Sequence, residues 1–122
     1  MPIISGINAI ITFPPSNKTA YEGTVVQLAC STDDNVPVDW TFKQQGSSTT
    51  VPVYEAGSIS DERKFSVNEG NNWYNLTIKN VTVENNGTYS CIDDTGNGES
   101  VQATVVVLAG WYLRDMICMR YD

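Results

Sequence analysis

Two pairs of adjacent aspartates are the residues best suited to bind a cation. Asp33-Asp34 and Asp93-Asp94 each lie in a stretch rich in turn-forming residues. Clustered carboxylates of this kind could hold Ca²⁺ or attract a basic partner. Acidic residues in short loops more often form solvated turns, however. We therefore expect no metal site and no cofactor.

Histidine, the commonest general base and metal ligand, is absent from all 122 residues. A Ser-His-Asp or Cys-His set is therefore impossible. Gly96-Asn97-Gly98 lacks the third glycine and the helix of a phosphate cradle. Lys and Arg number 7 against 14 Asp and Glu, a net charge of -7, which disfavours binding to phosphate backbones. The sequence predicts neither an enzyme nor a nucleic-acid-binding domain.

Four Asn-x-Ser/Thr sequons are candidates for covalent attachment of sugar. They begin at Asn17, Asn75, Asn80 and Asn86. In a chain this rich in Asn, Ser and Thr, roughly two would arise by chance. The positions of the sequons in the fold therefore matter more than their number.

The elements that must position these residues are short strands. Apolar and polar residues alternate in Val26–Cys30, Val38–Phe42 and Tyr74–Ile78, as expected for strands with one buried face. Clusters of Gly, Asn, Asp, Ser and Pro separate the strands, which favours an antiparallel sandwich or barrel. Pro14-Pro15 interrupts the first strand, and only an edge strand tolerates that. The length predicts one domain, and no apolar run approaches the roughly 20 residues of a membrane span.

The three cysteines have different surroundings. Cys30 ends one alternating segment, Cys91 lies in another with Trp40 between them, and Cys118 lies in a stretch without alternation. Cys30, Trp40 and the run Asn85-Asn86-Gly87-Thr88-Tyr89-Ser90-Cys91 resemble the immunoglobulin superfamily, whose pattern is Cys, Trp and then Asp-x-Gly-x-Tyr-x-Cys. The resemblance covers residues 7–108 and leaves 109–122 as a tail outside the domain.

This resemblance implies an all-β fold: an immunoglobulin-like, two-sheet antiparallel sandwich with Greek-key connections. It also implies a disulfide between Cys30 and Cys91, closing a loop of about 60 residues and worth about 4 kcal/mol on the chain-entropy model. Trp40 should pack beside that bond, and the Tyr89 hydroxyl should find a backbone partner. The spacing favours a V-set or I-set domain. A V-J-like antigen-receptor relative is the alternative, with Gly96-Asn97-Gly98 as its bulge.

Two positions that usually form an ion pair depart from the family pattern. Asn85 stands where the family usually has Asp, and Lys64 stands where its Arg partner usually lies. Asn85 accepts a hydrogen bond but forms no ion pair. A pair between Arg63 and Glu84 is a candidate substitute.

The sheet that holds the family's strands C, C′, F and G is the expected protein contact. Strand phase points Asn75 outward from the other sheet, and Asn80 and Asn86 flank the E–F turn, so no sequon falls on these four strands. The predicted outward residues of this binding face are Thr41, Lys43, Val53, Tyr54, Ser90 and Ile92. The alternative is that they are ordinary solvent-facing residues.

The predicted function is protein recognition outside the cell, as a secreted or cell-surface ectodomain. The partner would be another protein or a second copy of the chain, bound through the C-C′-F-G face and the end loops. N-linked glycans are expected, and any membrane attachment would lie outside this chain. The alternative is a structural spacer module in a multi-domain chain.

Overall fold

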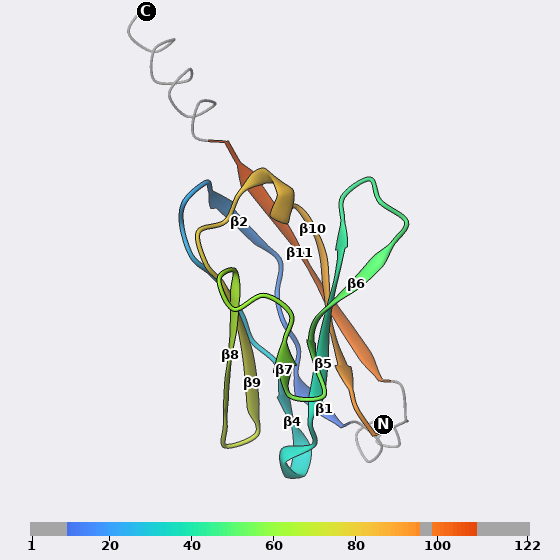
Figure 1. The fold of residues 1–122 in the computed structure, drawn as a ribbon. Coiled ribbons are helices and arrows are strands. Elements are labelled where there is room, and N and C mark those ends of the chain that lie inside the picture. The colour runs from blue at the N-terminus through green and yellow to red at the C-terminus, as the bar shows by residue number, and fades with distance from the viewer. Residues whose placement is uncertain (1–9, 96–98, 110–122) are drawn as a thin grey trace, which may run out of the picture.

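The computed structural model describes residues 10–95 and 99–109, and these form a two-layer β-sandwich (Figure 1). Their strands are β1 (Ile11–Phe13), β2 (Lys18–Tyr21), β3 (Val26–Leu28), β4 (Ser31–Thr32), β5 (Val38–Gln44), β6 (Thr50–Glu55), β7 (Ser58–Ile59), β8 (Phe65–Gly70), β9 (Trp73–Ile78), β10 (Gly87–Asp93) and β11 (Ser100–Leu108). Two short 3-10 helices, η1 (Asp33–Asn35) and η2 (Val83–Asn85), lie at opposite ends of the sandwich. The expected tail at 109–122 lies outside the described residues except for Ala109.

One layer is a five-stranded sheet in which β9 is central. The order is β1-β4-β9-β3, and β8 also pairs with β9. The three alternating segments of the sequence form β3, β5 and β9, so the alternation predicted their phase correctly. These strands correspond to A, B, D and E of the family.

The other layer is a six-stranded sheet of order β2-β11-β10-β5-β6-β7. Here β5, β6, β10 and β11 correspond to C, C′, F and G, and β7 is a short C″. All its pairs are antiparallel except β2 with β11, which is parallel. Because Pro14-Pro15 ends β1, the chain leaves the first sheet and β2 joins the edge of the second. Both segments are edge strands, as the two prolines predict.

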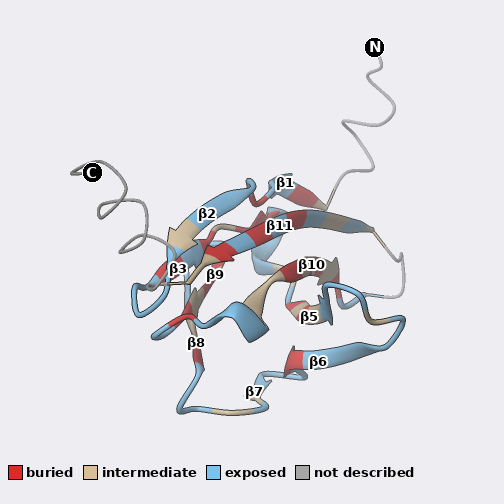
Figure 2. Ribbon diagram, turned by 90° about the horizontal axis from the view of Figure 1, so that it is seen from above, coloured by how far each residue is buried: buried red, intermediate tan, exposed pale blue. Residues whose placement is uncertain are grey.

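The core lies between the two sheets, where the buried positions of Figure 2 gather. Cys30 and Cys91 are bonded across it with a sequence separation of 61. Trp40 is 0% exposed, and its Nε1 donates a 2.9 Å hydrogen bond to the Tyr74 carbonyl. The Tyr89 hydroxyl donates to the Asn85 carbonyl at 3.1 Å, and burial raises the pKa of Tyr89 to about 12. The family-derived core is therefore confirmed.

Gly87 begins β10 where the two strands approach closely. Its φ is +155°, and a Cβ there would lie 2.3 Å from the Lys43 carbonyl oxygen of β5. A side chain would push β5 and β10 apart, so only glycine fits.

Candidate functional site

The outer face of the six-stranded sheet is built from rows of side chains that the strand register brings together. Ser90 of β10 pairs with Thr41 of β5 and with Gln102 of β11, and Thr41 pairs in turn with Pro52 of β6. Alternation turns these residues outward while Trp40 and Cys91 point into the core. We call this surface the C-C′-F-G face.

The two flanking rows add the charges and the apolar residue of this face. In one row, Lys43 and Thr104 flank Thr88. In the other, Asp39 and Ser100 flank Ile92, which is half-buried. Asp39 Oδ1 accepts a 3.3 Å hydrogen bond from the Ala56 N–H, so that carboxylate already has a partner. Small neutral side chains therefore make up most of the face.

Val53 and Tyr54 do not lie on this face, contrary to the expectation from sequence. Val53 is 2% exposed and Tyr54 is 4% exposed. The register of β6 against β5 shifts between Trp40 and Thr41, so one extra residue is inserted in β6. The Tyr54 hydroxyl donates to the Glu69 carboxylate of β8 and so links the two sheets. Pro52 takes the outward position beside Thr41.

The two acidic pairs lie at the same end of the sandwich. The Asp94 N–H donates to the Pro37 carbonyl at 2.9 Å, which holds the hairpin after β10 against the loop after η1. Asp33 and Asp34 are exposed within η1. Among the described residues, no three His, Cys, Asp or Glu side chains gather closely enough to hold a metal ion.

Asp93 is buried, and its hydrogen bonds hold the residues at this end of the sandwich in place. It is 3% exposed, and its carboxylate accepts from the Thr95 hydroxyl, the Thr95 N–H and the Glu99 N–H. Burial by itself raises the pKa of Asp93, but these hydrogen bonds outweigh it and hold the pKa below its ordinary value.

Glu99 is a structural residue that sequence reasoning missed. One carboxylate oxygen of Glu99 accepts from the Ile10 N–H at 2.7 Å and from the Ile11 N–H at 2.8 Å. Glu99 therefore fixes the start of β1 beside the hairpin that precedes β11. A contact between positions 88 residues apart leaves no local signal in the sequence.

The four sequons differ in how their amides are used. Asn86 Nδ2 donates to the Val83 and Val107 carbonyls, so its amide is committed to the fold. Asn17 Oδ1 accepts from the Thr104 N–H at 2.8 Å, which places this sequon at the β11 edge of the C-C′-F-G face. None of the four sequon asparagines lies on β5, β6, β10 or β11, but Asn17 precedes β2 at the edge of the same sheet, a position that the sequence did not predict. Asn75 and Asn80 lie away from the face, as expected.

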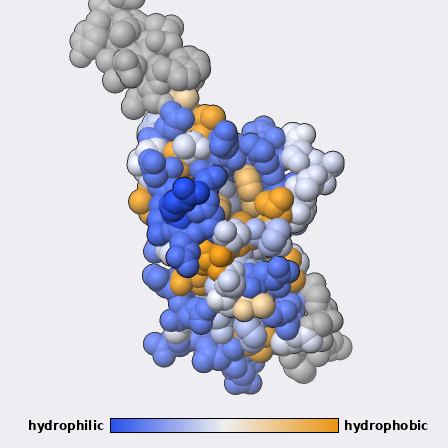
Figure 3. Space-filling model, viewed as in Figure 1, coloured by the Kyte–Doolittle hydropathy of each residue, from blue (hydrophilic) through white to orange (hydrophobic). Residues whose placement is uncertain are grey.

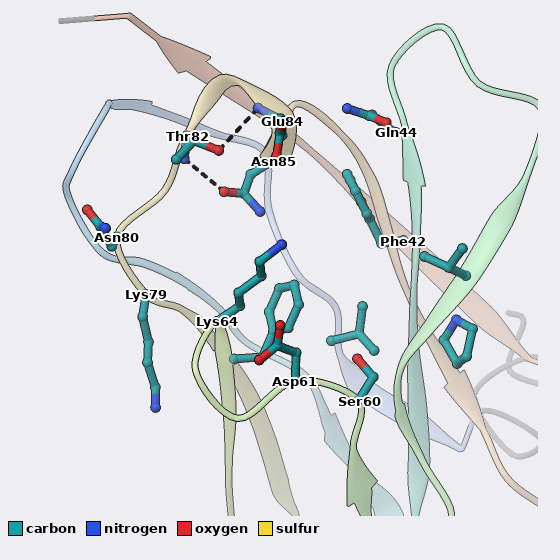
Figure 4. A pocket seen from close by; sticks show the side chains of 14 residues that line it. Phe42, Gln44, Ser60, Asp61, Lys64, Lys79, Asn80, Thr82, Glu84 and Asn85 are labelled. Carbon is teal, nitrogen blue, oxygen red and sulfur yellow. Dashed lines mark hydrogen bonds between the residues drawn. The ribbon is translucent and has the colours of Figure 1, made fainter.

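A hollow of about 550 Å³ lies at Lys64 and Asn85, the two positions that depart from the family pattern (Figure 4). Lys64 and Asn85 both line it, and Lys64 extends into it in the direction of Asn85. Asn85 Oδ1 instead accepts from the Thr82 N–H at 2.8 Å. Arg63 pairs with Asp61, Nε to Oδ1 at 3.4 Å, so the expected Arg63–Glu84 substitute is wrong.

The surface around this hollow is mixed in character. On the face that Figure 3 shows, hydrophobic residues form small areas separated by hydrophilic ones.

No helix in the part of the chain that the structure describes is long and apolar enough to cross a membrane.

Comparisons with known proteins agree with this architecture. The family model for the immunoglobulin V-set domain matches residues 13–108. Human myelin protein zero-like protein 3 is 28% identical over 86 residues, which cover 58% of this chain and 37% of that protein. Human T cell receptor beta variable 29-1 is 29% identical over 98 residues, covering 71% of this chain and 86% of that protein. This chain thus spans well under half of the myelin relative.

A solved structure shows the same fold. The RIG-5 IG1 homodimer superposes with a TM-score of 0.67 at 24% identity, covering 81% of this chain and 95% of that chain. At that identity, the likeness extends to the fold alone.

Proposed function

We propose that this chain, which belongs to the immunoglobulin V-set family, is an extracellular protein-recognition domain that binds through its C-C′-F-G face. The myelin and T cell receptor relatives favour adhesion or receptor roles outside the cell. The Cys30–Cys91 bond supports the same location, because reducing compartments do not sustain such bonds.

The composition of the face is the observation that carries this proposal. The chain has a net charge of -7, yet the three register rows contain only Asp39 and Lys43 as charged residues. Interface centres are depleted of charge in the same way. Ile92 offers an apolar contact near one end, and burying the neutral hydroxyl and amide groups around it costs less free energy than burying charged groups would.

A second copy of the chain is the partner we propose first. The C-C′-F-G face spans four neighbouring strands and can supply the roughly 800 Å² per partner of a standard interface. In a symmetric pair, the face contacts itself, so Asp39 of one copy can approach Lys43 of the other. A glycan on Asn17 would border the contact along β11 without covering its centre.

Ile92→Asp tests the proposal because it places a charge in the contact without disturbing the core. The matched control is Gln27→Asp, which adds the same charge on the outer face of the other sheet. Sedimentation velocity at high micromolar concentration should show a dimer for the native chain and for Gln27→Asp, but a monomer for Ile92→Asp. A monomeric native chain, or a dimer that Ile92→Asp leaves unchanged, would remove self-association through this face.

A spacer role is the second candidate, favoured by the positions of the first and last strands. β1 begins at one end of the sandwich, and β11 ends at the other (Figure 1). Tandem domains need this arrangement to form an extended row. Small-angle scattering on the full precursor would separate the roles, because a spacer should give an elongated particle with no concentration-dependent association.

A further inference from the structure

We infer that Trp73 and Phe13 form an aromatic platform for the first N-acetylglucosamine of a glycan on Asn75. This inference rests on the extracellular location proposed above. It concerns the outer face of the β1-β4-β9 sheet, on the opposite side of the sandwich from the C-C′-F-G face.

The platform exists because of a β-bulge. Ile11 of β1 is buried, and strict alternation would turn Phe13 inward as well. The register against β4 shifts between Ile11 and Phe13, and Phe13 is instead 52% exposed. The bulge therefore turns a large apolar ring towards solvent.

Phe13 and Trp73 meet across a small residue. Ser31 pairs with Phe13 on one side and with Trp73 on the other. Because Ser31 is short, the two rings close over it, with centroids 5.3 Å apart and planes tilted by 57°. On the far side of Trp73, its partner in β8 is Gly70, which has no side chain to cover the indole.

Asn75 follows Trp73 on the same face of β9. Positions 73, 75 and 77 are half-buried and alternate with the buried Tyr74, Leu76 and Ile78. Two residues along a strand span about 6.6 Å, so a group attached to Asn75 lies beside the Trp73 ring. The sequon is completed by Thr77, also on this face.

The Asn75 amide is oriented with its nitrogen available. Oδ1 accepts a 3.2 Å hydrogen bond from the Cys30 N–H, and Nδ2 donates to no described residue. Asn86 differs, because its Nδ2 already donates to two carbonyls. A sugar on Asn75 Nδ2 therefore leaves the hydrogen bond to Cys30 intact.

The covalent step needs a lipid-linked oligosaccharyl diphosphate as donor. The bond between Nδ2 and C1 of the sugar forms as the bond between C1 and the diphosphate breaks. The lipid diphosphate leaves, and the amide loses one proton. The apolar C–H face of the attached pyranose can then pack on the aromatic rings, burying surface that is otherwise exposed.

A double-mutant cycle on the full chain, secreted from mammalian cells and trimmed enzymatically to one N-acetylglucosamine per site, tests the inference. Thr77→Val removes the Asn75 sugar while keeping the Asn75 amide, and Trp73→Ser removes the platform. The sugar should lower the unfolding equilibrium constant by about two- to tenfold when Trp73 is present, and have little effect in Trp73→Ser. Thr19→Val, which removes the Asn17 sequon at an exposed position of β2, is the control, because the residue two before Asn17 is Pro15, which offers no aromatic ring.

Two further measurements keep the inference falsifiable if Trp73→Ser folds poorly. Peptide mass spectrometry should find Asn75 occupied, and NMR should show ring-current shifts of the Asn75-linked sugar that shrink in Phe13→Ser. An unoccupied Asn75, unshifted sugar resonances or an equal effect of the sugar with and without Trp73 would each overturn the platform. None of these results bears on dimerisation through the C-C′-F-G face, so the two proposals fail separately.

Discussion

Trp40 allows the energetics of the core to be tested one contribution at a time. Its indole is fully buried beside the Cys30–Cys91 bond and donates one hydrogen bond, to the Tyr74 carbonyl. Trp40→Ala empties the space of a large ring and should lower the free energy of unfolding by about 3 to 5 kcal/mol. Trp40→Phe keeps most of the apolar volume but removes the donor, and should cost about 1 to 2 kcal/mol.

The assay is urea unfolding followed by far-ultraviolet circular dichroism, with Thr41→Ala as the neighbouring control. Thr41 faces outward on the same strand, so its truncation should change the free energy by less than about 0.5 kcal/mol. Equal midpoint shifts for Trp40→Ala and Thr41→Ala would refute the strand phase. A shift for Trp40→Phe as large as that for Trp40→Ala would refute the separation of volume from hydrogen bonding.

Three further variants test polar contacts. Asp93→Asn should lower the free energy of unfolding by about 2 kcal/mol at pH 7. The pKa of Asp93 is depressed in the folded state, so the ionised carboxylate stabilises the fold above the ordinary pKa of 3.8, and this contribution is lost as pH falls through the folded-state pKa. If Asp93→Asn and the native chain lost stability equally between neutral and acidic pH, this reasoning would be contradicted. The pKa of Tyr89 is raised to about 12, so the neutral hydroxyl stabilises the fold below pH 10, and that contribution is lost between pH 10 and 12. In Tyr89→Phe, the free energy of unfolding should therefore fall less steeply over this pH range. Asn85→Asp places a carboxylate at the cap of η2 and opposite Lys64, and should raise the free energy of unfolding by about 0.5 to 1 kcal/mol. Denaturation in low and high salt checks this gain, which should shrink with salt and in a Lys64→Met background.

The sequence predicted those parts of the fold that leave a periodic or motif signal. Alternation gave the inward phase of Trp40 and Leu76, and the family motif gave the disulfide and the Tyr89 hydroxyl contact. These residues are specified by strand period and by a fixed spacing, both of which are local properties.

The errors arose where one inserted residue or one long-range contact changes the outcome. A bulge in β6 buries both Val53 and Tyr54, which the sequence predicted to face outward. A register shift of one residue inverts which side chains face out, and nothing in this short segment marks the insertion. Asn17 reaches Thr104 only because the chain changes sheets after Pro14-Pro15, which the sequence indicated as an edge but not as a transfer.

That change of sheets also protects the chain against aggregation. The segment from β1 to β2 covers the β4 edge of one sheet and the β11 edge of the other. The strand that β2 pairs with, β11, is nine residues long, and its Val101–Leu108 stretch contains no charged residue. An uncovered strand of this kind is a template for pairing with other chains. Cleavage within residues 14–17 that released β1 and loosened β2 would therefore expose a valine-rich strand edge that can pair with other chains.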